Sequence, residues 1–122
     1  MWILELTNKL GKVQRFHLVF GGDYTIGRKG CDIIIDDADV SISRTHAKIT
    51  VLSVPAGSLT QVGYVPEVYL ADSSKHGTFV NEAEVFAIES SKKLQDGDKI
   101  RFGKYTNATI SYSPIIVALS DS

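Results

Sequence analysis

The chain is divided into short runs rich in β-branched and aromatic residues, and each run ends at residues that favour turns. These runs are 2–7, 15–20, 24–27, 33–35, 47–52, 68–70, 78–80, 99–102, 108–112 and 115–117. Turn-forming residues lie between them, at 21–23, 29–30, 36–37, 55–57 and 96–98. Many short strands at this spacing predict an antiparallel β-sandwich or β-barrel. Asp96-Gly97 is a turn signal typical of a β-hairpin.

Two stretches interrupt this pattern. Residues 83–93 are the one place where a helical turn is conceivable, but two consecutive serines interrupt the stretch and favour a loop. Lys92 and Lys93 are then expected to be solvated loop residues. Residues 53–63 form a polar insertion with the composition of a loop. No internal repeat, low-complexity tract or domain boundary is evident.

The size of the chain is typical of one domain. Its 122 residues are 43% hydrophobic and 22% charged, with a net charge of −1. This composition supports one hydrophobic core and argues against disorder. We expect no room for a second, catalytic domain. The balanced charge gives no overall attraction to nucleic acid or to an anionic membrane, although local patches remain open.

Cys31 is the single cysteine, so the chain cannot form an internal disulfide or a cysteine-based zinc site. This usage is consistent with a reducing compartment, and a position beside an apolar run predicts a small buried side chain. No run approaches the length of about 18 apolar residues needed to span a membrane. The first residues lack the pattern of a signal peptide, so we expect none.

Cationic side chains gather in three turns, together with glycine or hydroxyl residues. The turns are 27–30, 41–46 and 72–78, and the cations are Arg28, Lys29, Arg44 and Lys75. Loops on a rigid scaffold commonly carry function. A chain with balanced charge that concentrates four cations in this way predicts a local anion site.

A phosphate monoester suits these residue types. It carries a charge of about −1.5 to −2 and three strong acceptor oxygens at pH 7. Arginine offers a planar fork of donors and lysine a movable charge. A serine hydroxyl and backbone N–H groups beside glycine can fill the remaining acceptor directions.

The order and spacing of the motifs resemble the forkhead-associated (FHA) family over nearly the whole chain. They are Gly27-Arg28, Ser43-Arg44-Thr45-His46, Ser74-Lys75-His76-Gly77-Thr78-Phe79-Val80-Asn81, Leu94-Gln95-Asp96-Gly97-Asp98 and Phe102-Gly103. The Gly-Arg pair alone does not indicate a family, but the ordered set of motifs is highly specific to this one.

The resemblance implies an all-β, FHA-type antiparallel β-sandwich of about eleven strands, with phosphothreonine bound by the loops at one end. It assigns phosphothreonine binding to Arg28, Ser43, Arg44 and Lys75. It assigns contacts with the peptide backbone, or with residues that set specificity, to Lys29, Thr45, Ser74 and His76. Loop support falls to Gly27, His46, Gly77, Thr78 and Asn81, with the two glycines expected to supply turn conformations. His76 stands where many members carry Asn, so its contact departs from the family pattern.

Within the family, the likeness is greatest to members that serve DNA double-strand-break repair and checkpoint signalling. It implies an FHA domain over 1–116 and a stub at 117–122 that leads to absent BRCT-like domains. The implied partners are phosphothreonine peptides of repair adaptor or nuclease-cofactor proteins, and the rest of the repair complex through regions absent here. The implied location is the nucleus. No catalytic residue, metal, cofactor, direct nucleic-acid contact or membrane contact is expected.

Other functions remain to be weighed. The chain can be an FHA domain of another nuclear signalling protein, a phosphate-independent interaction module, or a nucleic-acid binder. Ser43, His46 and Asp72 supply the residue types of a hydrolase triad, but no Gly-x-Ser-x-Gly nucleophile elbow is present. We therefore do not expect an enzyme.

Overall fold

The computed structural model describes residues 1–35, 39–53, 65–85 and 91–113, and these residues form eleven β-strands and no helix. The first six strands are β1 (Trp2–Thr7), β2 (Val13–Leu18), β3 (Asp23–Gly27), β4 (Ile33–Ile34), β5 (Ala47–Val51) and β6 (Val68–Asp72). The remaining five are β7 (Thr78–Val80), β8 (Ala83–Glu84), β9 (Lys92–Leu94), β10 (Lys99–Phe102) and β11 (Thr106–Tyr112). Over the described residues, no helix is long and apolar enough to cross a membrane.

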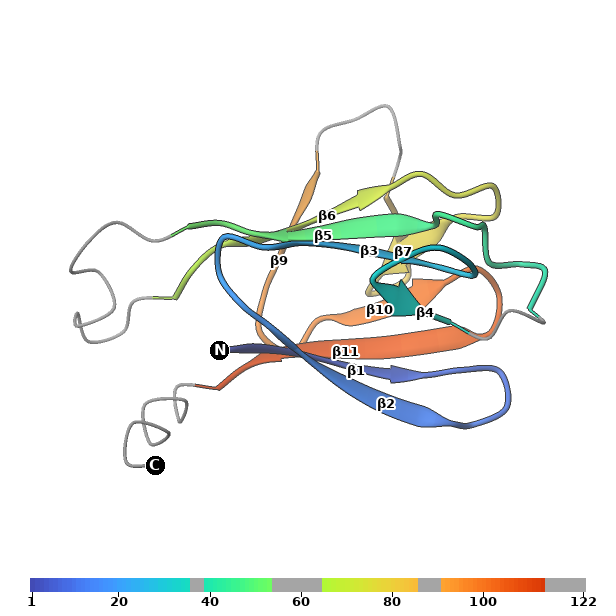
Figure 1. The fold of residues 1–122 in the computed structure, drawn as a ribbon, viewed down its shortest axis with the longest axis horizontal. Helices are drawn as coiled ribbons and strands as arrows, with labels where there is room; N and C mark the ends of the chain where they lie inside the picture. Colours follow the sequence, from blue (N-terminus) through green and yellow to red (C-terminus); the bar gives the residue numbers. More distant parts are fainter. Residues whose placement is uncertain (36–38, 54–64, 86–90, 114–122) are drawn as a thin grey trace.

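The strands form two sheets that pack face to face as a sandwich (Figure 1). One sheet has the order β2-β1-β11-β10-β7-β8, and the other has the order β4-β3-β5-β6-β9. Neighbouring strands are antiparallel except β3 and β4, which pair in parallel. The sequence left a sandwich and a barrel open, and the sandwich expected from the FHA resemblance is confirmed.

The core lies between the sheets and follows the alternation of side chains along each strand. In β1, Trp2, Leu4 and Leu6 are buried while the residues between them are half-buried. Most of the buried apolar side chains are β-branched or leucine, and Phe102 is the largest that is fully buried. Trp2 also donates a hydrogen bond from its indole N–H to the Pro66 carbonyl at 2.8 Å. One continuous core therefore holds both sheets together.

The loop predicted over residues 83–93 was wrong. The stretch expected as a loop contains β8 and the start of β9, so Lys92 and Lys93 lie in a strand. These two strands are short and largely exposed, and they lack the apolar alternation that marks the others. Pairing of β8 with β7 and of β9 with β6 therefore determines these strands, and the local sequence does not. The expected strand at 115–117 lies outside the described residues.

The Asp96-Gly97 turn is real but does not close a hairpin. The strands on either side of it, β9 and β10, belong to different sheets. Gly97 has a φ of +90°, and its N–H donates to the Ile110 carbonyl of β11. The Asp96 carboxylate accepts from the Tyr112 N–H at 2.9 Å. These contacts attach the turn to β11, so the chain crosses between the sheets instead of folding back on itself.

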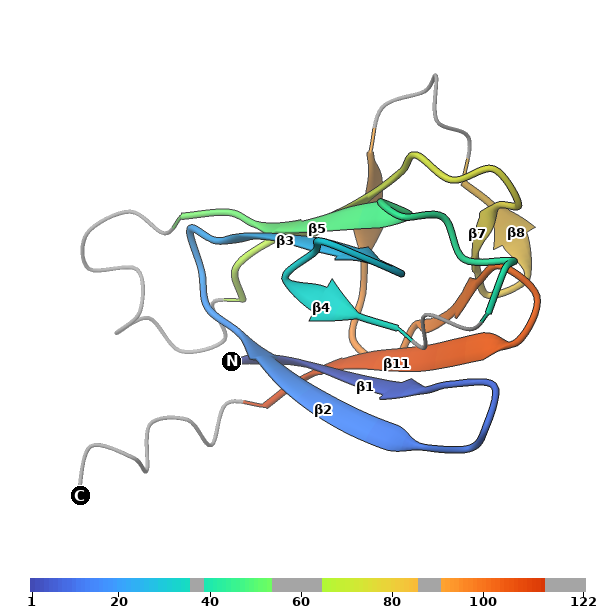
Figure 2. The same ribbon diagram turned by 45° about the vertical axis from the view of Figure 1, so that its right-hand side comes forward.

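Five connections meet at one end of the sandwich, and the chain begins at the other end (Figures 1 and 2). They are the β1–β2, β3–β4, β4–β5, β6–β7 and β10–β11 connections. Three of these contain the cationic turns singled out in the sequence. The fold therefore brings the turns that contain Arg28, Arg44 and Lys75 to a single end.

Candidate anion-binding site

Backbone hydrogen bonds join the β3–β4 connection to the β4–β5 connection. The Arg28 N–H donates to the carbonyls of Ser43 and Arg44, at 3.0 and 3.1 Å. The Lys29 N–H donates to the Arg44 carbonyl at 3.3 Å. Two cationic turns that are far apart in sequence are thereby held in contact.

Gly27 makes this contact possible through its lack of a side chain. A Cβ atom at this position would lie 2.0 Å from the Arg44 carbonyl oxygen. Gly27 has no positive φ, so it is required for close approach and not for the turn conformation expected from the sequence. Gly77 does have the expected conformation, with a φ of +99°.

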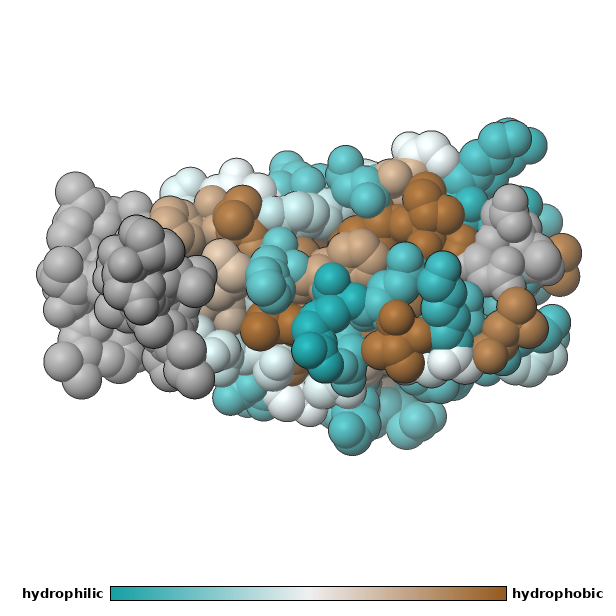
Figure 3. Space-filling view, turned by 60° about the horizontal axis from the view of Figure 1, so that its bottom comes forward, coloured by the Kyte–Doolittle hydropathy of each residue, from teal (hydrophilic) through white to brown (hydrophobic). Residues whose placement is uncertain are grey.

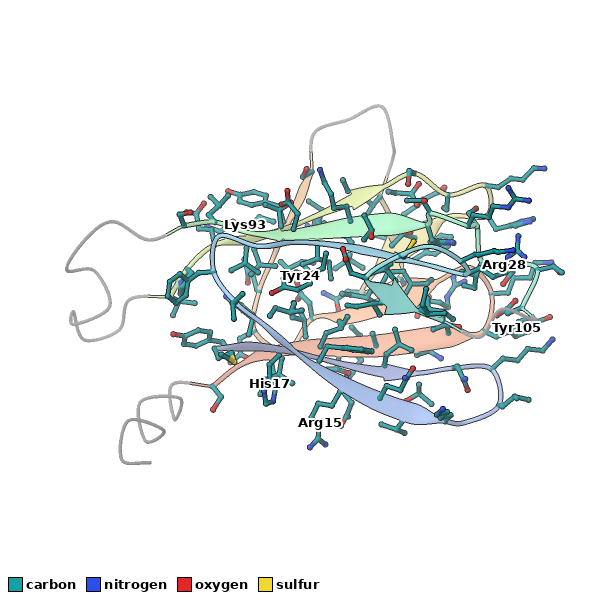
Figure 4. The ribbon with its side chains drawn as sticks, in the orientation of Figure 1. Arg15, His17, Tyr24, Arg28, Lys93 and Tyr105 are labelled. Carbon is teal, nitrogen blue, oxygen red and sulfur yellow. The ribbon has the colours of Figure 1, made fainter. Side chains whose placement is uncertain are left out.

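Arg28 is half-buried and is fixed at one atom of its side chain. Its Nε donates to the Ile42 carbonyl at 2.8 Å. The two terminal guanidinium nitrogens have no acceptor among the described residues, and Lys29, Arg44 and Lys75 form no ion pair there. Arg28 lies at the loop end of the sandwich, whereas Arg15 projects from the side of β2 (Figure 4). The guanidinium is thus oriented, and within the described ranges the N–H groups of its terminal nitrogens are free to donate.

Ser43 connects the β4–β5 connection to the β6–β7 connection. Its hydroxyl oxygen accepts from the Lys75 N–H at 2.9 Å. Its own N–H donates to Nδ1 of His46 at 3.0 Å. The hydroxyl hydrogen remains available, because the oxygen acts only as an acceptor in these contacts.

His46 is fully buried and bonds both turns through its ring. Nδ1 accepts from the Ser43 N–H, so the ring proton is on Nε2, which donates to the Gly77 carbonyl at 2.8 Å. The ring also meets Phe102 edge to face, with centroids 5.9 Å apart. Burial lowers the pKa of His46 below its ordinary value of 6.5, although the Gly77 carbonyl and Asp72 favour the charged ring.

The β6–β7 connection is organised by Asp72, which the sequence analysis placed in this turn but considered for a role only as a triad residue. One oxygen of its carboxylate accepts from the Ser74 N–H and hydroxyl, at 3.2 and 2.6 Å, and from the Thr78 hydroxyl at 2.6 Å. The Ser74 hydroxyl oxygen also accepts from the Gly77 N–H at 2.8 Å. The Asp-x-Ser spacing, typical of a turn closed by its own side chains, was the signal that could have identified Asp72.

The other predicted site residues occupy two environments. Lys29, Arg44, Thr45, Lys75 and His76 are exposed at the loop end. Ser74 is half-buried, and its hydroxyl contacts lie within its own loop. The ligand contacts assigned to these residues stay predictions.

Asn81 lies away from the cationic turns, on the β7–β8 turn, with a φ of +50°. Its side-chain amide donates to Asp98 and its side-chain oxygen accepts from the Lys99 N–H, each at 3.0 Å. These contacts join the turn to the start of β10. Cys31 is half-buried, not buried as predicted, and its thiol lies 3.1 Å from the Arg44 carbonyl oxygen.

The geometry does not assemble a hydrolase triad. His46 accepts from the backbone N–H of Ser43 and not from its hydroxyl. Its other ring nitrogen contacts the Gly77 carbonyl, while Asp72 accepts from Ser74 and Thr78. Within the described part of the chain, no group of three metal-ligating side chains is present. The arrangement supplies hydrogen-bond donors and positive charge, which suit an anion.

Known proteins are similar to this chain in both sequence and fold. A family model for the FHA domain matches residues 24–103. The chain is 38% identical to mouse nibrin over 121 residues, which cover 98% of this chain and 16% of that protein. The chain therefore spans a small part of the relative that it matches.

Two solved structures add to this likeness. The S. pombe Nbs1–Ctp1 complex matches with a TM-score of 0.71 and 28% identity, over 93% of this chain and 36% of the matched chain. The yeast Dun1 FHA domain, in complex with a doubly phosphorylated peptide derived from Rad53, matches with a TM-score of 0.68 and 28% identity. That match covers 90% of this chain and 74% of the other.

Proposed function

This chain belongs to the FHA-domain family, and from that premise we propose that it is a phosphothreonine-dependent protein-recognition module and not an enzyme. The observation that carries the proposal is the state of Arg28. Its Nε is fixed on the Ile42 carbonyl, and its terminal nitrogens have no acceptor among the described residues. A guanidinium held in this way is oriented for an external anion before the anion arrives.

Arg28 and Ser43 are the primary phosphate ligands in this proposal. The free guanidinium nitrogens donate to phosphate oxygens, and the Ser43 hydroxyl donates its unused hydrogen. Arg44 and Lys75 flank the phosphate and balance its second negative charge. Each charge-assisted hydrogen bond contributes about 1.5–3 kcal/mol. Lys29, Thr45 and His76 contact the peptide on either side.

Selectivity for threonine over serine needs its own cause, because both residues carry the same phosphate. One additional methyl group accounts for about 0.8 kcal/mol by transfer, which is roughly fourfold in affinity. A larger preference requires a slot that receives the methyl group and orients the phosphate. We place this slot between the Ser43 and Lys75 turns, which the hydrogen bond between these residues holds together.

Similarity to the relatives supports a cellular role. The identity to mouse nibrin supports a place in a nuclear double-strand-break repair and checkpoint protein. The partners are then phosphorylated acidic motifs of repair adaptor or nuclease-cofactor proteins. The FHA domain covers 1–116, and residues 117–122 lead to BRCT-like domains. An FHA domain of another nuclear signalling protein is the alternative.

A peptide titration tests the proposed function. Three peptides of one sequence carry threonine, phosphothreonine or phosphoserine, and their dissociation constants are measured by calorimetry. We expect measurable binding only with phosphate, and a preference of more than fourfold for phosphothreonine over phosphoserine. Equal affinity for the phosphorylated and unphosphorylated peptides would support a phosphate-independent interaction module instead.

A further inference from the structure

Two turns at the loop end of the sandwich take no part in the proposed phosphate site. They are the β1–β2 turn, residues 8–12, and the β10–β11 turn, residues 103–105. Tyr105, in the second turn, lies at the same end of the molecule as Arg28 (Figure 4). Lys9 of the first turn lies over the Tyr105 ring, with its Nζ 4.9 Å from the ring centroid. The two turns therefore form one continuous surface.

The β10–β11 turn is attached directly to the phosphate loops. The Gly103 N–H donates to the Gly77 carbonyl at 2.9 Å. The Lys104 N–H donates to the Ser41 hydroxyl at 3.1 Å. A ligand bound at Ser43 and Lys75 therefore lies close to this turn, because the carbonyl and the hydroxyl that accept from it belong to the same two loops.

The β1–β2 turn is also ordered by its own contacts. The Asn8 side chain accepts from the N–H groups of Leu10 and Lys12, each at 3.0 Å. Gly11 has a φ of +84°, which favours glycine. Leu10 is thus held outward by a defined turn.

The two most exposed of the large apolar side chains lie at this end. Val40 is 84% exposed and Leu10 is 80% exposed, the highest values among the large hydrophobic side chains in the described ranges. Val40 lies between the buried residues Asp39 and Ser41, and Ser41 accepts from Lys104. Hydrophobic residues among hydrophilic ones are visible at the right-hand end of the space-filling view (Figure 3). Single exposed apolar side chains are ordinary, so what marks this end as a contact surface is their place beside the phosphate loops.

The charge of the β1–β2 and β10–β11 turns has one sign. Lys9 and Lys12 flank Leu10, and Lys104 precedes Tyr105. Neither turn contains an aspartate or a glutamate. We name this surface the lysine ledge and define it as Lys9, Leu10, Lys12, Val40, Lys104 and Tyr105.

We propose that the lysine ledge binds a second part of the same phosphopeptide, an acidic stretch that carries one aliphatic anchor. This proposal rests on the phosphothreonine binding proposed above. The lysines balance the acidic side chains, and Leu10, Val40 and the Tyr105 ring cover the anchor. Affinity then depends on residues beyond the immediate neighbours of the phosphothreonine.

A peptide fits the ledge better than a nucleic acid does. Single-stranded nucleic acid needs a series of aromatic rings for successive bases to stack upon, and the ledge has only Tyr105. Leu10 and Val40 offer aliphatic contact, which suits a leucine or a valine of a partner. The hydrogen bonds to the phosphate loops also make the ledge an extension of the peptide site.

The test uses three peptides with one phosphothreonine each. One has neutral flanks, and the others carry a leucine among acidic residues on the amino-terminal or on the carboxyl-terminal side. Calorimetry compares the wild type with the double variants Lys9→Glu/Lys104→Glu and Leu10→Ser/Val40→Ser. Lys48→Glu is the matched control, because Lys48 is exposed on β5.

We expect the wild type to bind one acidic peptide about 5- to 30-fold more tightly than the neutral peptide, as a few exposed charge pairs and one apolar contact would give. Each double variant loses most of this gain, while its affinity for the neutral peptide changes by no more than about twofold. Lys48→Glu should keep the higher affinity for the acidic peptide.

Three results would overturn the proposal. The first is equal binding of all three peptides by the wild type, and the second is that the double variants keep the full gain in affinity. The third is that a single-stranded oligonucleotide binds the wild type but not Lys9→Glu/Lys104→Glu, while the peptides bind these two proteins equally. Failure of the phosphothreonine proposal looks different, since the neutral phosphopeptide would then bind no better than its unphosphorylated form.

Discussion

The backbone N–H of Lys75 donates a hydrogen bond to the hydroxyl oxygen of Ser43 at 2.9 Å, across 32 residues of sequence. This bond sets the separation of the two loops, and it turns the hydroxyl hydrogen of Ser43 away from Lys75. The same serine therefore joins the two loops and keeps a hydroxyl donor available for the phosphate that we propose it binds.

Replacing Ser43 tests both roles. Ser43→Ala would remove the proposed charge-assisted hydrogen bond to phosphate, so we expect the phosphopeptide affinity to fall by about 10- to 150-fold. The free energy of unfolding should fall by only about 1 kcal/mol, because the exposed Lys75 N–H can bond to water. Ser73→Ala is the matched control, since Ser73 is exposed and, within the described ranges, its hydroxyl donates only to the Thr45 carbonyl. An affinity loss of equal size in both variants would contradict a specific role for Ser43.

Arg28 should dominate the affinity. Arg28→Ala removes the oriented guanidinium, and we expect a loss of at least about 10- to 150-fold in phosphopeptide affinity by calorimetry. Arg28→Lys should recover only part of it, because an ammonium cannot donate two parallel hydrogen bonds. Arg15→Ala, which removes an exposed arginine paired with Glu5 on the side of the sandwich, should bind normally. Normal binding by Arg28→Ala would remove this residue from the site.

The buried ring of His46 makes the stability of the free domain depend on pH. Burial lowers its pKa below 6.5, and His76 adds to this, whereas Asp39, Asp72 and the Gly77 carbonyl oppose it. The unfolded chain then binds a proton near pH 6.5 while the folded domain does not. The free energy of unfolding should therefore decrease as the pH falls from 6.5 towards the pKa of the folded state, and this contribution should become constant below it.

Denaturant titrations between pH 7.5 and 5.5 measure that slope without any peptide, so protonation of the phosphate cannot contribute. An NMR titration of the ring protons identifies the residue, with His46 expected to titrate below 6.5 in the folded domain. His17→Gln, a change at an exposed ring on β2, removes one other histidine signal and so helps to identify that of His46. A folded-state pKa for His46 at or above 6.5 would contradict the prediction.

Gly27 should tolerate no side chain. In Gly27→Ala the new Cβ would lie 2.0 Å from the Arg44 carbonyl oxygen, so the β3–β4 and β4–β5 connections must separate. We expect a loss of several kcal/mol in the free energy of unfolding, about 3 or more, as for other severe overpacking. Gly30→Ala is the control in the same connection. It has open space but a φ of +72°, so it should cost only about 1 kcal/mol.

The sequence predicted most of the fold because alternation between buried and exposed positions is a local property. β1 and β5 follow it closely, and their predicted bounds differ from the observed ones by no more than one residue. β9 was missed because its lysines are exposed and only Leu94 is buried, so pairing with β6 determines it. The Asp96-Gly97 turn was recognised, but its contacts with β11 decide which sheet follows.

The sequence indicated which residue types form the candidate site, but it did not indicate the contacts between them. The four cations were found because a charged residue in a turn is visible in the sequence. The reason why position 27 must be glycine could not be predicted, since the Arg44 carbonyl that excludes a side chain lies in another loop. Asp72 was placed in the third turn but was given no role in ordering it, because three donors on one carboxylate oxygen become apparent only when the loop is folded.

Asp72 provides a last prediction, as a positioning residue that does not touch the ligand. Asp72→Ala leaves the Ser74 and Thr78 hydroxyls without their shared acceptor, so the β6–β7 loop should lose its defined conformation. Asp72→Asn keeps an acceptor oxygen at the same place and should recover much of the function. We expect phosphopeptide affinity to fall about tenfold or more in Asp72→Ala, and by a smaller factor in Asp72→Asn.

Amide exchange in the free protein separates positioning from a general loss of stability. In Asp72→Ala, the Lys75 and Gly77 N–H groups should exchange faster, while the amides of β1 and β11 stay protected. Equal effects of the alanine and asparagine variants on affinity would show that the negative charge matters and not the acceptor geometry. The hydrogen bonds at 2.6 Å to Ser74 and Thr78 would then not be what orders the loop.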